Sequence, residues 1–266
     1  MSAPSKACYS DVDDATWALI APVLAQARGR GRPRTHADRT IYNAILFVLR
    51  GGIPWRMLPP TYPSWQTVYS RFARWADSGV WEQLADTIRA DLRLEMGREP
   101  TPSAGIIDSQ SVATGPGSGA IGFDVGKKVK GRKRHLVVDT LGTVLAALVT
   151  PASVQDPTAA PELLAQAKAK SPRLAWIWAD RRYRGPTVAR AAQALDLTVE
   201  VVVPPAGRRG FQVEVKRWII ERTFAWLGRY RRLARDWEAA SWSATAFLYI
   251  AASNTAARRL AHLWAT

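Results

Sequence analysis

The pattern of apolar residues changes near residue 100, and this change most limits the folds open to the chain. Earlier residues show the three- and four-residue spacing of amphipathic helices, whereas later residues alternate short apolar runs with helices. The change falls in the segment REPTPSAG, residues 98–105, which is rich in proline and small residues. We therefore predict a helical domain over residues 1–100 and an α/β domain over residues 101–266.

The first domain is expected to contain four helices. Asp11 or Asp13 is positioned to cap the first, glycines end the second, and the third runs from a cap at Ser64 to a stop at Gly79. The third helix has the side chains of a DNA recognition helix on its polar face, although a surface helix of a small bundle would carry similar residues. These candidate DNA contacts are Gln66, Thr67, Ser70, Arg71 and Arg74. The domain is thus predicted to be helix-turn-helix-like.

The second domain reads in the order β-β-β-α-β-α-β-α. The segments RKRHLVVDT and GTVLAALVT are joined at DTLG, which is typical of a hairpin, and the first three strands can form a meander. The alternation that follows predicts parallel strands with helices on the sheet faces. Residues 217–237 read as one final helix, with Trp218, Phe224, Leu227, Tyr230 and Leu233 on its apolar stripe.

Three acidic residues are the candidate catalytic and metal-binding groups. Asp108 and Asp180 end the first and fourth predicted strands, and Glu221 lies in the last helix. Ligands of open α/β sheets gather at the carboxyl ends of parallel strands, so the two aspartates are expected to meet there. Three carboxylates repel one another unless a cation compensates them, and oxygen ligands favour Mg²⁺ or Mn²⁺. Two such ions would serve phosphoryl transfer.

Other acids have structural interpretations. Asp139 lies in the hairpin and is expected to form its turn, while Asp156 precedes Pro157 and is expected to cap a helix. Asp124, in a glycine-rich loop, has no predicted role.

The charge of the chain favours a nucleic acid partner. The net charge is +15, of which residues 1–100 hold +3 and residues 101–266 hold +12. Such an excess binds polyanions, because each neutralised phosphate releases counterions. One cysteine and three scattered histidines exclude a disulfide framework and a zinc site of the usual ligand set. No apolar run is long enough to span a membrane, so we expect a cytoplasmic protein.

Basic segments supply further candidate DNA contacts. The segment RGRGRPRTH suits either a linker or a narrow minor groove, and GKKVKGRKRH leads into a strand whose alternate side chains would follow a DNA backbone. Arg217 lies one helical turn before Glu221, where it can pair with that carboxylate or bind a phosphate. The candidates are Arg30, Arg32, Arg34, Lys127, Lys128, Lys130, Arg132, Lys133, Arg134, Arg208, Arg209 and Arg217.

Several motifs resemble the bacterial insertion-sequence-five family of transposases. The matching segments include IIDSQSV, GKKVKGRKRHLVVDTLG, WADRRYRG and RWIIERTFAWLGRYRRLARDWE, in the order of the family and over nearly the whole chain. The resemblance implies an RNase H-like core, with a mixed five-stranded sheet flanked by helices and a D-D-E triad at Asp108, Asp180 and Glu221. It also places Arg217 at the arginine of a tyrosine-arginine-glutamate-lysine signature, and Arg229 beside its lysine position.

The sequence departs from the family at some positions. Members usually carry a glycine or lysine and then a glycine after the second aspartate, where this chain has Arg181 and Arg182. If that turn needs a positive φ, a residue other than glycine costs on the order of 1 kcal/mol. Glu214 and Gly228 replace the tyrosine and lysine of the signature.

The resemblance implies a Mg²⁺-dependent DNA transposase that binds the terminal inverted repeats of its element and joins them to target DNA. Such a protein has no small-molecule substrate, and two DNA ends require two active sites, so we expect a homodimer on DNA. One alternative is a transposase-derived DNA-binding regulator without activity. Another is a general metal nuclease related to RNase H.

Overall fold

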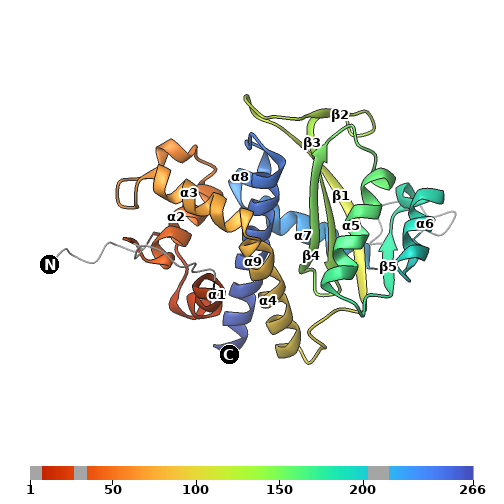
Figure 1. Ribbon diagram of the computed structural model, residues 1–266, viewed down its shortest axis with the longest axis horizontal. Coiled ribbons are helices and arrows are strands. Elements are labelled where there is room, and N and C mark those ends of the chain that lie inside the picture. The colour runs from red at the N-terminus through yellow and green to blue at the C-terminus, as the bar shows by residue number, and fades with distance from the viewer. Residues whose placement is uncertain (1–7, 27–34, 203–215, 266) are drawn as a thin grey trace.

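The N-terminal half of the chain is a group of helices. The computed structural model describes residues 8–26, 35–202 and 216–265. Figure 1 shows the first helices on the side of the molecule away from the sheet. The N-terminal elements are α1 (Asp14–Gln26), α2 (Asp38–Gly51), the short 3-10 helix η1 (Trp55–Met57), α3 (Trp65–Asp77) and α4 (Val80–Glu95).

The predicted caps of these helices are present. The Asp13 carboxylate accepts a hydrogen bond from the backbone N–H of Thr16 at 2.7 Å, and Ser64 Oγ accepts one from Thr67 at 3.4 Å. Gly52 and Gly79 follow α2 and α3 with φ of +69° and +71°, a left-handed conformation that glycine adopts without strain. Local sequence therefore sets where these helices begin and end.

The second half contains one mixed sheet. Its strands are β1 (Ala104–Ala113), β2 (Gly122–Asp124), β3 (Val129–Asp139), β4 (Val144–Pro151), β5 (Trp176–Ala179) and β6 (Thr198–Val201). The order across the sheet is β4-β3-β1-β5-β6, with β2 pairing the start of β3. β3 is antiparallel to both neighbours, whereas β1, β5 and β6 are mutually parallel. The predicted meander, hairpin and parallel strands are confirmed; β2 is an additional short strand.

Helices cover both faces of this sheet. The helices α5 (Asp156–Lys170) and α6 (Pro186–Ala194) pack on the face that carries Ile107 and Val137. The other face carries Ile106, Leu136 and Val138, and it packs against α7 (Arg217–Gly228) and α9 (Ser241–Trp264). None of the described helices combines the length and the apolar character needed to span a bilayer.

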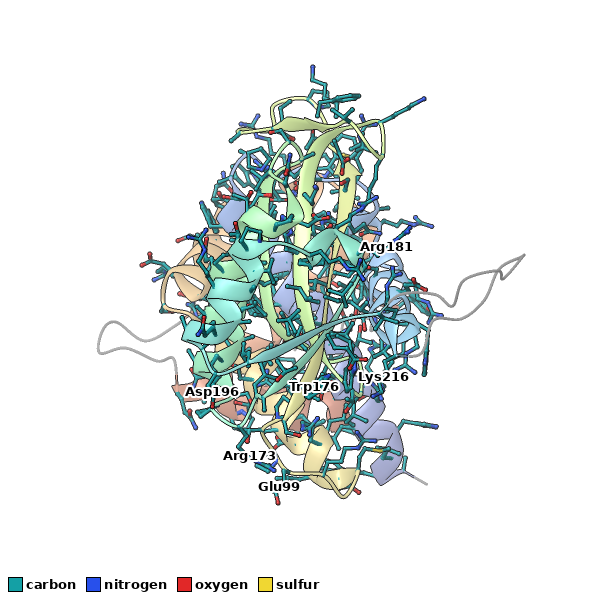
Figure 2. All side chains as sticks on the ribbon, turned by 90° about the vertical axis from the view of Figure 1, so that its right-hand side faces the viewer. Glu99, Arg173, Trp176, Arg181, Asp196 and Lys216 are labelled. Atoms are coloured by element: carbon teal, nitrogen blue, oxygen red, sulfur yellow. The ribbon has the colours of Figure 1, made fainter. Side chains whose placement is uncertain are left out.

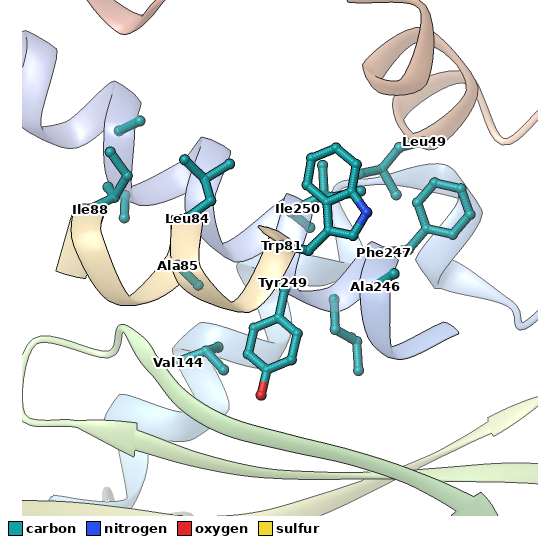
Figure 3. Packing of buried hydrophobic residues seen from close by; sticks show 14 of the residues in the cluster. Leu49, Trp81, Leu84, Ala85, Ile88, Val144, Ala246, Phe247, Tyr249 and Ile250 are labelled. Atoms are coloured by element: carbon teal, nitrogen blue, oxygen red, sulfur yellow. The ribbon is translucent and has the colours of Figure 1, made fainter. Parts of the chain in front are cut away.

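The last helix, α9, joins the two halves through a common core. Figure 3 shows Trp81 and Leu84 of α4 against Phe247 and Ile250 of α9, with Val144 of β4 beneath them. The Tyr249 hydroxyl reaches the sheet and accepts a hydrogen bond from the backbone N–H of Ala147 at 3.1 Å. One apolar cluster therefore runs from the N-terminal helices to the sheet. The division of the chain at residue 100 stays a prediction.

Two expectations about the elements were wrong. β1 does not end at Asp108 but continues to Ala113, because its later residues still pair with β3. Residues 217–237 are not one helix: α7 ends at Gly228, and only the short α8 (Arg231–Ala234) follows before α9. Of the predicted apolar stripe, Trp218 is 42% exposed, whereas Phe224, Leu227, Tyr230 and Leu233 are buried.

Candidate active site

Asp108 and Asp180 come level with each other where β5 ends. The parallel register pairs Ile106 of β1 with Trp178 of β5, and each aspartate lies two residues further along its segment. Asp180 follows β5 directly and begins the 3-10 helix η2 (Arg181–Tyr183). Its carboxylate accepts a hydrogen bond from the backbone N–H of Arg182 at 2.8 Å, which fixes its orientation.

Glu221 is connected to Asp108 through Arg217. Helix α7 packs on the face of β1 from which Asp108 projects. The same nitrogen, Arg217 Nη2, lies 3.7 Å from Asp108 Oδ2 and 3.5 Å from Glu221 Oε1. The Arg217–Glu221 pair considered from the sequence is therefore present, and it extends to Asp108. Glu221 is the most accessible of these groups, with 54% of its side chain exposed against 16% for Asp108.

The environment of Asp108 disfavours its charged form. Burial raises the pKa of Asp108 from 3.8 to about 6, and the negative charge of Asp180 adds to this effect. The N–H of Ser109 donates to the carboxylate at 2.7 Å and opposes the rise, as do the charges of Arg217 and Lys127. The cations present thus compensate the two aspartates only in part.

Replacing Asp108 by asparagine is expected to stabilise the metal-free chain at neutral pH. Between pH 3.8 and about 6, the folded chain binds more protons at Asp108 than the unfolded chain, so stability falls as the pH rises through this range. Asp108→Asn removes that loss, which is on the order of 1–3 kcal/mol. Urea unfolding in EDTA would show a more stable variant at about pH 8 and little difference near pH 4. A variant that is less stable than wild type at about pH 8 would contradict this account.

The donor set fits a hard divalent cation at the two aspartates. Carboxylate oxygens are the ligands that Mg²⁺ and Mn²⁺ prefer. Burial, and secondarily the charge of Asp180, raise the pKa of Asp108, and a bound cation would favour its charged form. Within the described residues, no three acidic, histidine or cysteine side chains lie close enough together to hold one ion. The Arg217 guanidinium contacts the two acids that a shared ion would have to join, Asp108 and Glu221.

A buried polar network lies on the opposite face of β1. Asp156 accepts a hydrogen bond from Ser109 Oγ at 2.7 Å and lies 3.2 Å from Lys133 Nζ and 3.8 Å from Arg182 Nη1. Asp156 therefore links the segments that carry Asp108 and Asp180. The predicted capping role of Asp156 was wrong, because Gln155 occupies the cap position of α5 and makes no side-chain cap.

Asp124 and Asp139 also have structural partners. Asp124 accepts a hydrogen bond from Ser111 Oγ and lies 3.5 Å from Lys133 Nζ. Asp139 accepts hydrogen bonds from two backbone N–H groups of its hairpin, so its predicted turn role is confirmed. It also pairs with Arg93 at 2.6 Å in a fully buried position. The sequence signal for these networks was weak, because their partners are distant along the chain.

Three residues of the predicted basic track are buried. Arg132, Lys133 and Arg134 are 1%, 5% and 2% exposed, because β3 lies between β1 and β4 and both its faces are covered. Arg134 Nη1 donates to the Leu233 carbonyl at 2.6 Å, and Arg132 Nη1 lies 3.4 Å from Asp236. The prediction that these three residues contact DNA was therefore wrong. Their charged side chains form ion pairs and hydrogen bonds inside the protein.

The other candidate DNA contacts differ in their accessibility. Gln66, Thr67, Ser70 and Arg74 are exposed on α3, whereas Arg71 is half-buried and pairs with Asp38 at 3.0 Å. Lys128, Lys130 and Arg229 are exposed, and Lys127 is half-buried, with Nζ donating to the Ser109 carbonyl at 2.9 Å. Other candidates lie outside the described residues: Arg30, Arg32, Arg34, Arg208 and Arg209.

The turn after Asp180 accepts arginine without strain. Neither Arg181 nor Arg182 has a positive φ; both belong to the 3-10 helix η2. Figure 2 shows Arg181 on the β5–β6 side of the molecule, above Trp176 and Lys216. The arginines at these two positions therefore cause none of the backbone strain that a positive φ would impose.

Comparison with known proteins identifies the family. Residues 99–254, more than half of the chain, match the model of the "Transposase DDE domain" family, and residues 12–85 match that of the "Putative transposase of IS4/5 family". No solved structure matches the chain.

Two proteins of Burkholderia cepacia illustrate the similarity to individual relatives. The "Putative transposase for insertion sequence element IS402" is 38% identical over 115 residues, which cover 39% of this chain and 52% of the relative. The "Insertion element IS402 uncharacterized 16.2 kDa protein" is 34% identical over 88 residues, which cover 31% of this chain and 60% of the relative. The chain thus spans between half and 60% of the length of these relatives.

These matches bear on both main predictions from the sequence. The family resemblance is confirmed, as is the α/β class with an RNase H-like core behind a helical region. The chain belongs to the transposase DDE domain family.

Proposed function

We propose that the chain cuts and joins DNA strands as the transposase of a bacterial insertion sequence, with Asp108, Asp180 and Glu221 as its catalytic and metal-binding residues. The observations that carry this proposal are the position of Asp108 level with Asp180 and the contact of Arg217 with both Asp108 and Glu221, in a chain of the DDE family. The partners would be the terminal inverted repeats of the element and target DNA, bound in the cytoplasm by a homodimer.

The residues of the site would act in distinct ways. Asp108 and Asp180 would hold a divalent ion between neighbouring strands, and Glu221 would complete the ligand set once Arg217 turns from the carboxylates to a DNA phosphate. Two Mg²⁺ ions, or Mn²⁺ in their place, would activate the attacking oxygen and stabilise the leaving one. Asp156 would keep the segments of Asp108 and Asp180 in register through Ser109 and Arg182. Lys127 would add positive charge beside Asp108.

The proposal is tested with DNA from the ends of the element that encodes the chain. Purified protein should bind a duplex of the terminal sequence and, with Mg²⁺, nick it at the element boundary; EDTA should abolish the nick. Binding without cleavage would favour the inactive regulator. Equal cleavage of an unrelated RNA–DNA hybrid would favour a general nuclease. Short inverted repeats flanking the coding region would support the mobile-element assignment independently.

A further inference from the structure

A cavity with no role in the proposed reaction lies where the N-terminal helices meet the end of α7. Its volume is about 820 Å³, and its walls come from α2, the α7–α8 junction, α9 and residues 8–10. Among the described residues that line it, five are arginines and none is an aspartate or glutamate. We call it the arginine cavity after Arg50, Arg229, Arg231, Arg258 and Arg259.

The charges of the arginine cavity are not neutralised within the described part of the chain. Arg258 and Arg259 donate to the backbone carbonyls of Asp11 and Leu141, each at 3.2 Å, and neither forms an ion pair with a carboxylate there. Elsewhere in the chain, buried arginines such as Arg93 and Arg232 each pair with an acid. Uncompensated guanidinium groups gathered in one cavity favour a bound anion.

The electrostatics of the cavity agree with this interpretation. Burial lowers the pKa of Arg258, and the nearby charge of Arg50 lowers it further. Burial also lowers the pKa of Arg259, with the charge of Arg222 adding to it. Asp13 and Asp139 oppose these effects from outside the cavity. The folded protein therefore holds these cations against their mutual repulsion, and an anion would relieve it.

Aromatic rings hold two of the guanidinium groups in place. The Arg50 guanidinium lies 5.6 Å from the centre of the Tyr230 ring, and that of Arg259 lies 5.1 Å from the Trp226 ring. Stacked guanidinium planes lose less freedom when they bind a phosphate through two hydrogen bonds. Arg229 and Arg231 are exposed, so solvent and ligands can reach the cavity.

Helix α7 connects the arginine cavity to the active site. Trp226 and Arg229 follow Glu221 by five and eight residues, which corresponds to about 8–12 Å along a helix. Successive nucleotides of one strand advance by about 3.4 Å along B-DNA, so this distance spans about two to four nucleotides. A strand that ran along α7 with its reacting phosphate at Glu221 would therefore reach the cavity with neighbouring phosphates.

We propose that the arginine cavity binds the phosphate backbone of the DNA strand that enters the active site, about two to four nucleotides from the reacting phosphate. This inference rests on the proposed function. Since Arg50 belongs to α2 and the other four arginines to the C-terminal half, the bound strand would contact both halves of the chain.

The test compares two double variants that remove the same charge. Arg50→Gln with Arg258→Gln alters the cavity, and Arg98→Gln with Arg190→Gln, at residues that line no part of it, is the control. Binding of a labelled duplex of about 30 base pairs is measured in EDTA by fluorescence anisotropy over a salt series. The cavity variant should bind about tenfold more weakly, with its salt dependence reduced by about two phosphate contacts beyond the control.

Two further measurements locate the contact and guard against misfolding. Arg229→Gln with Arg231→Gln changes exposed side chains and should show the same loss. Neutral methylphosphonates placed about two to four nucleotides from the element boundary should weaken binding by wild type but not further weaken binding by either cavity variant. Cavity variants that match the control in affinity and salt dependence would overturn the inference. Tight binding of a short acidic peptide in the cavity that leaves DNA affinity unchanged would overturn it as well. Because EDTA prevents cleavage, a chain that never cuts DNA would fail the proposed function while leaving this result intact.

Discussion

Glu221→Gln is expected to leave DNA binding intact and to reduce Mg²⁺-dependent strand cleavage on the order of 10³-fold. The amide has nearly the shape of the carboxylate, and the side chain is 54% exposed, so the fold should not change. The substitution removes a charged oxygen ligand for a cation and leaves Arg217 in contact with Asp108. The loss corresponds to about 4 kcal/mol of transition-state stabilisation. Single-turnover nicking of an element-end duplex measures it.

Glu162→Gln provides a matched control for this prediction. Glu162 is also an exposed helical glutamate, on α5, and its carboxylate accepts a hydrogen bond from Gln166 Nε2 at 3.2 Å, away from the candidate catalytic residues. This variant should bind and cut as wild type does. Cleavage by Glu221→Gln at the wild-type rate would remove Glu221 from the catalytic set, and loss of DNA binding in the same variant would assign it a structural role instead.

The nearness of Asp108 and Asp180 was predictable because it follows from local rules. A strand followed by an aspartate, next to a parallel strand, brings Asp180 beside Asp108 whatever the rest of the fold does. The helical period of residues 217–227 placed Arg217 and Glu221 on one face. The contact of Arg217 with Asp108 was not predictable, because it depends on how α7 is docked on β1.

The C-terminal helix carries a local sequence signal, although it was not predicted. Residues 241–264 form α9, the longest helix described, and this helix was not among the elements predicted from the sequence. Phe247, Ile250, Asn254 and Ala257 follow a helical period, and all four are buried. Gly228 likewise marked the end of α7 within a stretch that was expected to continue as helix.

The basic segment that runs into β3, residues 127–134, shows a limit of composition. Six cations in eight positions suggested a DNA surface, but a strand in the middle of a sheet has both faces covered. The carboxylates that bind Arg132 and Lys133 come from Asp236, Asp156 and Asp124, and only the folded chain brings them together. Charge counts along a sequence cannot separate buried ion pairs from a DNA-binding surface.

Arg132→Met should therefore destabilise the protein by about 3–5 kcal/mol. The side chains of Arg132 and Asp236 are 2% and 1% exposed, and the methionine would leave the Asp236 carboxylate buried without its cation. Arg132 also donates to the backbone carbonyls of Glu238 and Ala239, at 2.9 and 3.0 Å, so the substitution frees the segment that leads into α9. The midpoint of urea unfolding, compared at an unchanged m-value, measures the loss.

Lys130→Met, two residues earlier in the same segment, should have the opposite combination of effects. Lys130 is exposed, so its replacement should change the free energy of unfolding by no more than about 0.5 kcal/mol. If Lys130 contacts a DNA phosphate, its loss should lower the salt dependence of binding by about one contact. The two substitutions, two residues apart, therefore distinguish a loss of stability from a loss of DNA binding. If the Arg132→Met protein were as stable as wild type but bound DNA more weakly, Arg132 would be a DNA contact and the structural role assigned to it would be wrong.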